Sequence, residues 1–256
     1  MALPILPLAV ADQETLGRAW SERHLPWSEK RLPWATLGLV ALTVLVHVLN
    51  VYVFGYSVAD MKSVYGVSNL VVQDAIEHGS LAALLGQLVH MVTYLFAHHS
   101  WWHLIGNMTA VLAFGPALEH RMGWRRFLAF YILAGFLTAL IFVAANIGVQ
   151  ADLATIGASG VTFALIGAAF FLPTSVRVIG VVFAWGYDAP FAFIPIAWMS
   201  LIYIGIQIID TVATGGLTEG GLNRYMHLIS AILGLLAVLF VPWFSMKPDR
   251  AAKSAA

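Results

Sequence analysis

Long apolar stretches recur along the chain and are separated by shorter polar segments. A helix that crosses the roughly 30 Å of hydrocarbon in a bilayer needs about 20 mostly apolar residues. Six stretches have this character, near residues 35–55, 100–118, 127–147, 154–172, 191–213 and 224–244. The pattern therefore predicts an all-α polytopic membrane protein with six transmembrane helices.

Two further apolar stretches compete for a place among the spans. Residues 176–187 are too short to cross a bilayer and include Arg177, which favours a loop at the membrane interface. Residues 81–96 carry no charged side chain and approach the length of a span, so they are a real rival. The number of spans cannot be decided from apolar character alone.

The distribution of lysine and arginine decides between these topologies, because cytoplasmic segments of membrane proteins carry an excess of both. With six spans and a cytoplasmic N-terminus, the outer side holds Lys62 and Arg224, and the inner side holds Arg18, Arg23, Lys30, Arg31, Arg121, Arg125, Arg126, Arg177, Lys247, Arg250 and Lys253. A span at 81–96 would invert everything after it and remove most of this bias. We therefore expect residues 56–99 to form one outer loop whose second half dips into the membrane, packed on protein or facing a water-filled cavity.

Composition supports this class and excludes others. Of the 256 residues, 60% are hydrophobic and 10% are charged, against about 25% charged in an ordinary soluble domain. The mean hydropathy is +0.83. The 13 basic and 13 acidic residues balance, so no net charge attracts nucleic acid. The absence of cysteine excludes a disulfide, a thiolate nucleophile and a cysteine-bound metal.

The chain divides into three parts on these grounds. Residues 1–34 form an N-terminal cytoplasmic or interfacial segment, residues 35–244 form the six-helix membrane domain, and residues 245–256 form a cytoplasmic tail. No organelle-targeting pattern is present, since residues 1–34 mix acidic with basic side chains. We expect an integral protein of a plasma or bacterial inner membrane with both termini in the cytoplasm.

Four polar side chains on three predicted spans fall at one depth. His103 and Asn107 lie four residues apart early in the second span and share one helix face. Ser159 lies early in the fourth span and His227 early in the sixth. All three spans run inward from the outer face, which places these side chains about one or two turns below it. Polar groups within a span are costly, so the cluster indicates a functional site near the outer face.

The residue types of this cluster suggest nucleophilic catalysis. A serine hydroxyl is a poor nucleophile until a base accepts its proton, and a neutral His227 is suited to that role and to protonating a leaving amine. His103, Asn107 and the backbone N–H of Ser159 are available donors for the oxyanion of a tetrahedral intermediate. No acidic residue is placed to orient His227, so we expect a Ser–His dyad.

Small residues favour the close helix packing that this dyad requires. The fourth span has Gly160 next to the serine, and the sixth has Ser230 and Gly234 four residues apart. Faces of small residues let two membrane helices approach closely. We therefore expect the fourth and sixth spans to pack together and to bring Ser159 within hydrogen-bond reach of His227.

This arrangement resembles the rhomboid family of intramembrane serine proteases over roughly residues 60–240. The second span reads HHSWWHLIGNM from His98, similar to the family's histidine-rich start followed by H-x-x-x-N, and Glu119 precedes R-M-G like the family's end of that span. The GASG sequence around Ser159 matches G-x-S-G. His227 is followed seven residues later by Gly234, as in the family's spacing.

The resemblance implies that Ser159 is the nucleophile and His227 the base. It implies an oxyanion site formed by His103, Asn107, Gly157 and the Ser159 amide. The family cleaves single-span membrane proteins within or beside their transmembrane helix, and it uses no metal or cofactor. The resemblance further implies a partly membrane-embedded first outer loop, a cap near residues 214–223, substrate access beside the fifth span, and stacking of Phe163 on His227.

Some positions need a separate interpretation. Met226 and Ser230 stand where the family usually has Ala and Gly, which bears on rate and substrate more than on reaction type. We interpret Glu119 as a structural ion pair or helix cap. His98 and His99 are interpreted as interfacial or structural, because a metal site at His99 and His103 would lack nearby carboxylates.

Two other functional classes stay open. A catalytically silent relative would bind transmembrane helices, although such relatives commonly lose the serine or the histidine that this chain keeps. A small-solute transporter predicts inverted repeats and helices broken at mid-depth. Here the polar residues cluster near one face and no halves repeat, which favours the protease.

Overall fold

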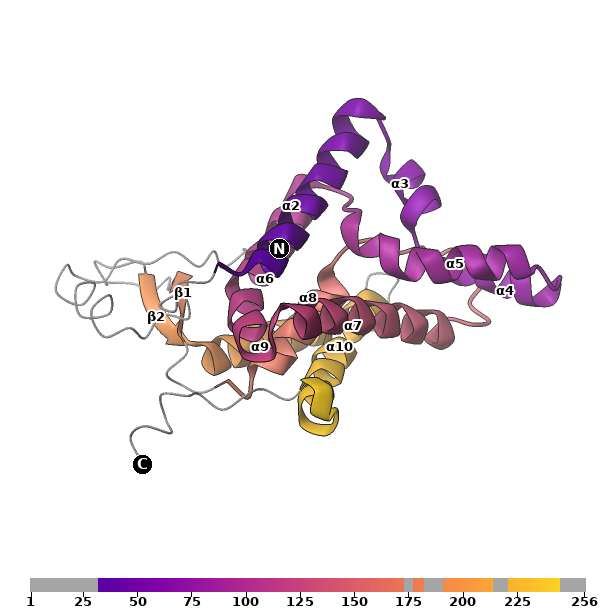
Figure 1. Cartoon of the computed structure of the whole chain (residues 1–256). Coiled ribbons are helices and arrows are strands. Elements are labelled where there is room, and N and C mark those ends of the chain that lie inside the picture. Colours follow the sequence, from indigo (N-terminus) through magenta and orange to yellow (C-terminus); the bar gives the residue numbers. More distant parts are fainter. Residues whose placement is uncertain (1–31, 173–176, 182–190, 214–220, 245–256) are drawn as a thin grey trace.

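The computed structural model describes residues 32–172, 177–181, 191–213 and 221–244, and most of this part of the chain is helical (Figure 1). The elements in chain order are α2 (Trp34–Val48), the π-helix η1 (Leu49–Val53), α3 (Val58–Tyr65), α4 (Asn69–Glu77), α5 (Leu81–Thr93), the 3-10 turn η2 (Tyr94–Phe96), α6 (Trp101–Met122), α7 (Trp124–Ala145), α8 (Ser159–Ala169), β1 (Arg177–Val181), β2 (Phe191–Pro195), α9 (Ile196–Ala213), α10 (Gly221–Phe240) and η3 (Pro242–Phe244). Nearly all of the predicted N-terminal segment, most of the predicted cap and the predicted tail lie outside the described residues.

Each of the six predicted stretches contains a helix, but fewer have the length and composition of a membrane span. Three candidate spans are present, at Trp34–Val53, Trp124–Ala145 and Ile196–Ala213. A fourth is present if Leu81–Phe96 and Trp101–Met122 count as one broken span. The helix α8 and the apolar part of α10 are shorter than a span. By length and composition the described residues therefore hold three or up to four candidate spans.

Residues 81–96 do not continue straight into α6. The two helical segments meet at an angle of 83°, which is the geometry of a re-entrant loop or a broken span. Figure 1 shows α4 and α5 extending together away from α6, and these two helices pack on each other. The bend therefore leaves both the loop that was expected to dip into the membrane and a broken span as interpretations of residues 81–96.

The segment predicted to form the first outer loop, residues 56–99, is more helical than its sequence pattern indicates. It contains α3 and α4 as well as α5, and serine caps begin these helices. The Ser57 hydroxyl accepts a hydrogen bond from the Asp60 amide, and the Ser68 hydroxyl accepts one from the Val71 amide. Such caps stabilise a short helix by about 1 kcal/mol each, without the long apolar run that marks a span.

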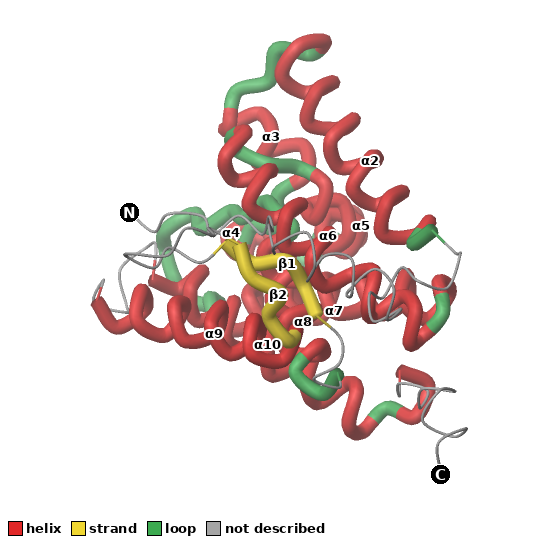
Figure 2. The backbone as a smooth tube through the Cα atoms, turned by 90° about the vertical axis from the view of Figure 1, so that its left-hand side faces the viewer, coloured by secondary structure: helices red, strands yellow, loops and turns green. Residues whose placement is uncertain are grey.

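The all-α prediction, with a loop at residues 176–187, is wrong for residues 177–181. These residues form β1, which pairs antiparallel with β2 so that Arg177 lies opposite Pro195 and Val181 opposite Phe191. Figure 2 shows the two strands side by side. The β-branched residues of β1 and the aromatic residues of β2 favour extended backbone, and pairing satisfies their amides and carbonyls.

The helix α8 lies inside the bundle and packs against α6, α7, α9 and α10. Nearly all of it is buried. It crosses α10 very closely, because a Cβ at Gly167 would overlap the Ala231 carbonyl and a Cβ at Gly234 would overlap the Ala164 carbonyl. Two glycines thus permit backbone contact between α8 and α10, the close packing expected of the fourth and sixth stretches.

Glu119 near the end of α6 caps the first turn of α2, which confirms the interpretation as a cap. Its carboxylate accepts hydrogen bonds from the amides of Ala35 at 3.1 Å and Thr36 at 2.8 Å, and from the Thr36 hydroxyl at 2.8 Å. A carboxylate is favourable there because the first amides of a helix lack partners and carry partial positive charge. This contact holds α2 against the helix that carries His103.

Candidate active site

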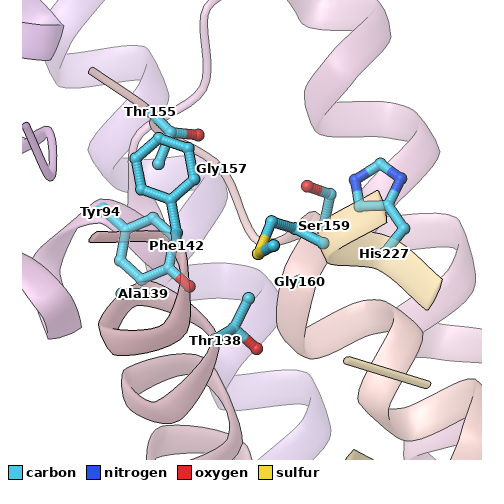
Figure 3. Close-up of a pocket in the computed structure, with 10 residues that line it drawn as sticks. Tyr94, Thr138, Ala139, Phe142, Thr155, Gly157, Ser159, Gly160 and His227 are labelled. Carbon is cyan, nitrogen blue, oxygen red and sulfur yellow. The ribbon is translucent and has the colours of Figure 1, made fainter. Parts of the chain in front are cut away.

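Ser159 and His227 lie in one pocket. Ser159 is the first residue of α8, and His227 lies in the second turn of α10. Both side chains line the pocket together with Gly157 and Gly160. Figure 3 shows the two side chains next to each other at the point where α10 crosses the start of α8. The close α8–α10 crossing is what brings the nucleophile candidate to the base candidate.

Two neighbours hold the imidazole of His227. The Phe163 ring stacks on it with centroids 4.5 Å apart and planes 7° apart, as the family resemblance implies. Its Nδ1 lies 2.9 Å from Oε1 of Gln207 on α9. Sequence reasoning missed Gln207, although an amide side chain within an apolar stretch was a signal in itself.

The segment before Ser159 has a backbone conformation that requires glycine. Gly157 has φ of +123°, and its amide donates to the Tyr94 carbonyl at 2.9 Å. The next amide, of Ala158, donates to Nε2 of His98 at 3.4 Å. The chain then enters α8, whose first amides carry partial positive charge. This geometry directs the start of α8 into the pocket.

Contacts from α4 hold the connection that leads to this segment. The Asn69 side chain donates to the carbonyls of Val149 and Ala151, both at 3.1 Å, and accepts from the Leu153 amide at 3.0 Å. One amide side chain therefore satisfies three backbone groups of an irregular segment. This anchor links α4 to the position of Ser159, a link that sequence reasoning did not find.

His103 and Asn107 lie on one face of α6 but do not line the pocket of Ser159 and His227. The His103 ring packs against Gly157, which does line the pocket. A Cβ added at Gly157 would overlap Cε1 of His103 and lie 2.9 Å from Nε2 of His103. Within the described ranges, Nδ1 of His103 and Nδ2 of Asn107 are buried and lack a hydrogen-bond partner. Buried polar atoms generally have partners, so these two are notable beside a candidate oxyanion site.

The histidines around His103 form a stacked group. The His99 ring stacks on His103 at a centroid distance of 4.2 Å, and the His98 ring meets it edge-on at 4.9 Å. Among the residues that the structure describes, no three His, Cys, Asp or Glu side chains are placed to hold a metal ion. The group therefore has the character of packed aromatic rings.

Ser230 connects α10 to Thr138 of α7, and the start of α8 packs on the same threonine. The Ser230 hydroxyl is fully buried, donates to the Met226 carbonyl at 2.6 Å and lies 2.9 Å from Oγ1 of Thr138. Gly160 packs on the same threonine, since a Cβ there would lie 2.6 Å from its Cγ2. The small residues at the site thus join three helices, not the expected two.

Low pH is expected to destabilise the fold through His98, which lies between η2 and α6. Burial lowers the pKa of this imidazole to about 4, from an ordinary value of 6.5. The folded state therefore holds the ring neutral, and its contribution to stability is complete above about pH 6.5 and lost as the pH falls toward 4. The loss should reach about 2 kcal/mol near pH 4.5.

Equilibrium unfolding in mixed micelles at pH 7.5 and 4.5 measures this effect. The control is His98→Gln, which keeps an acceptor for the Ala158 amide and does not titrate. We expect the stability of this variant to depend less on pH than that of the unmodified protein. An equal pH dependence of the two proteins would contradict the assignment to His98.

Comparison with known proteins places the chain in a family. The family model for the Rhomboid domain matches residues 85–244, which is more than half of the chain and includes all of the site residues predicted from the sequence. The chain belongs to the rhomboid family. This rhomboid chain is 30% identical over 104 residues to "Putative rhomboid protease YdcA" of Bacillus subtilis (strain 168), covering 39% of this chain and 49% of that relative. It is 29% identical over 83 residues to "RHOMBOID-like protein 5" of Arabidopsis thaliana, covering 32% of this chain and 26% of that relative. The matches thus span half or less of the relatives' own lengths.

Proposed function

We propose that this rhomboid chain is an intramembrane serine endopeptidase that cleaves peptide bonds in or next to transmembrane helices of single-span membrane proteins. The observation that carries the proposal is the meeting of Ser159 and His227 in one pocket, with Phe163 stacked on the imidazole. A serine beside a histidine held by a further group is the arrangement that nucleophilic catalysis requires.

The reaction follows from these positions. The Ser159 Oγ attacks the carbonyl carbon of the scissile peptide bond while His227 accepts the hydroxyl proton. Donors at the start of α8 and on His103 and Asn107 stabilise the oxyanion. The C–N bond then breaks, and His227 gives its proton to the departing amine. Water attacks the acyl-enzyme by the same route and releases Ser159.

The length of α8 supports a site within the membrane. Its 11 residues span only about 16 Å, roughly half of the hydrocarbon thickness. We propose six membrane segments formed by α2 with η1, α6, α7, α8, α9 and α10, with both termini cytoplasmic. Because α8 runs inward, its first residue then lies below the outer face of a plasma or bacterial inner membrane.

Labelling by a serine-reactive fluorophosphonate, together with reporter cleavage, tests this proposal. The protein is reconstituted with a single-span reporter that has small residues near the outer end of its helix. We expect the reporter to be cut in or beside that helix, and the probe to attach to Ser159 as mapped by peptide mass spectrometry. The control is His227→Ala, in which the serine remains but labelling should be lost.

Two results would contradict the proposal. Labelling that maps to another serine, or that persists in His227→Ala, would remove the dyad. If the reporter binds but is never cut, and the probe labels no serine, the results would favour a silent protein that binds transmembrane helices.

A further inference from the structure

Gln207 and Thr211 form a polar pair on an otherwise apolar helix. They lie four residues apart on α9, are 9% and 3% exposed, and face the interior of the bundle. Between them, Ile208 and Ile209 are exposed on the outward side of the helix. Polar side chains on the buried face of a membrane helix generally have a partner on a neighbouring helix. Here that partner is His227 of α10.

The hydrogen bonds of Thr211 determine how the Gln207 amide is oriented. The Thr211 hydroxyl donates its one proton to the backbone carbonyl oxygen of Gln207 at 2.7 Å. With its proton used in this way, Oγ1 of Thr211 can only accept a hydrogen bond from the Gln207 side chain. Nε2 of Gln207 lies 3.3 Å from this oxygen and is the donor. The amide nitrogen is thus directed to Thr211, and Oε1 is left to face Nδ1 of His227 at 2.9 Å.

This orientation selects one tautomer of the imidazole. An amide oxygen only accepts, so the Gln207–His227 hydrogen bond requires a proton on Nδ1. In the neutral ring the lone pair is then on Nε2. The hydrogen bond fixes the direction of the ring in its plane, and the stacked Phe163 ring fixes the plane itself. A base must present its lone pair to the nucleophile. The contacts with Gln207 and Phe163 therefore fix the direction in which the Nε2 lone pair points.

We infer that Gln207 is a positioning residue for His227 and that Thr211 orients Gln207. The inference rests on the proposed function, in which His227 is the base. It replaces the isolated dyad expected from the sequence with a chain of four side chains, Ser159, His227, Gln207 and Thr211. Gln207 touches neither the nucleophile nor, in this role, the substrate, and it acts through the imidazole.

A neutral amide suits this position physically. A carboxylate would orient the ring as well and would stabilise the protonated imidazole, but an ionised group within a membrane helix carries a large desolvation cost. Gln207 supplies the acceptor without the charge. His103 lies close enough to His227 for their charges to interact, and Asp210 lies three residues after Gln207 on α9. Both are left unchanged in the variants below.

Gln207→Met and Gln207→Glu test the inference by reporter cleavage. Methionine has a similar length and packs well in an apolar environment, but it offers no strong acceptor. We expect kcat to fall roughly 10-fold to 100-fold with KM nearly unchanged, since orientation of the base is lost and substrate contacts are not. Glutamate keeps an acceptor oxygen whether or not it is ionised, so Gln207→Glu should restore most of kcat. A wild-type kcat in Gln207→Met, or a change confined to KM, would overturn the inference.

Thr211→Val and Thr211→Ser form a matched pair for the second link. Valine has the shape of threonine without the hydroxyl, so the Gln207 amide is free to turn its nitrogen toward His227. We expect a smaller loss of kcat in Thr211→Val and nearly full activity in Thr211→Ser. Equal kcat in the two variants would overturn the role of Thr211.

Nitrogen-15 NMR of labelled histidine separates this inference from the proposed function, because it needs no cleavage. The His227 signals are identified by their absence in His227→Gln. At pH 8 we expect the ring proton on Nδ1 in the unmodified protein and a larger share on Nε2 in Gln207→Met. The same tautomer in both would overturn the inference even if cleavage occurs. The expected change would support the positioning even in a protein that fails to cut the reporter.

Discussion

Replacing Ser159 with alanine is expected to lower reporter cleavage by about 10⁴-fold or more. The substitution removes the acyl-enzyme route and leaves only attack by water, assisted by the oxyanion donors and by binding. Binding of the reporter should be retained, because Ser159 is only partly buried and alanine leaves the packing of α8 intact. The measurement is the initial rate at saturating reporter, with reporter binding measured in parallel.

The companion variants sharpen this result. His227→Ala should lose a comparable factor, and the double variant should lose little more than either single one, since two groups that act as a unit are not additive. The matched control is Ser200→Ala, which removes a different, fully buried serine whose hydroxyl donates to the Ile196 carbonyl one turn earlier on α9. Cleavage by Ser159→Ala within 10-fold of the unmodified protein would remove the nucleophile assignment.

The apolar pattern predicted where most helices lie, because a helix in lipid or in a protein interior needs a continuous apolar run. It was less successful at the fourth stretch, which was predicted from residue 154 but is helical only from Ser159. The preceding residues are apolar enough to continue the helix. They do not, because the Thr155 amide and carbonyl bond to the backbone of Val67, and the Gly157 amide donates to the Tyr94 carbonyl, in an irregular path. Such tertiary hydrogen bonds leave no periodic signal.

The candidate site likewise has some residues whose proximity could be predicted from the sequence and others whose contacts depend on tertiary packing. The meeting of Ser159 and His227 could be predicted, because few residue types perform acyl transfer and because the expected direction of their helices put them at one depth. The stacking of Phe163 on His227 was implied by the resemblance to the rhomboid family, and Phe163 lies one turn after Ser159 on the same helix. Gln207 could not be assigned a role, since that depends on how α9 is rotated against α10. The sequence shows that Gln207 is polar, and only the packing shows what it contacts.

Gly234→Ala is expected to destabilise the fold by about 3 to 5 kcal/mol, a large effect for one methyl group. The added Cβ would overlap the Ala164 carbonyl oxygen and lie 2.6 Å from its carbon. The Ala164 carbonyl is part of the backbone and cannot rotate aside as a side chain does. The helix α8 also packs against α6, α7 and α9, so it cannot move away from α10 without disturbing those contacts. The two helices would therefore separate, and Ser159 would move away from His227. Both the midpoint of unfolding in mixed micelles and the cleavage rate should fall together.

Gly205→Ala is the matched control for this prediction. Gly205 is also a glycine within an apolar helix, but a Cβ there would meet nothing within 4 Å. Alanine is the better helix former by up to about 1 kcal/mol, so this variant should be as stable as the unmodified protein or slightly more so. The contrast isolates contact between α8 and α10 from any general effect of replacing glycine in a helix. Equal stability of Gly234→Ala and Gly205→Ala would mean that α8 and α10 do not cross at backbone contact. The packing that joins Ser159 to His227 would then need another origin.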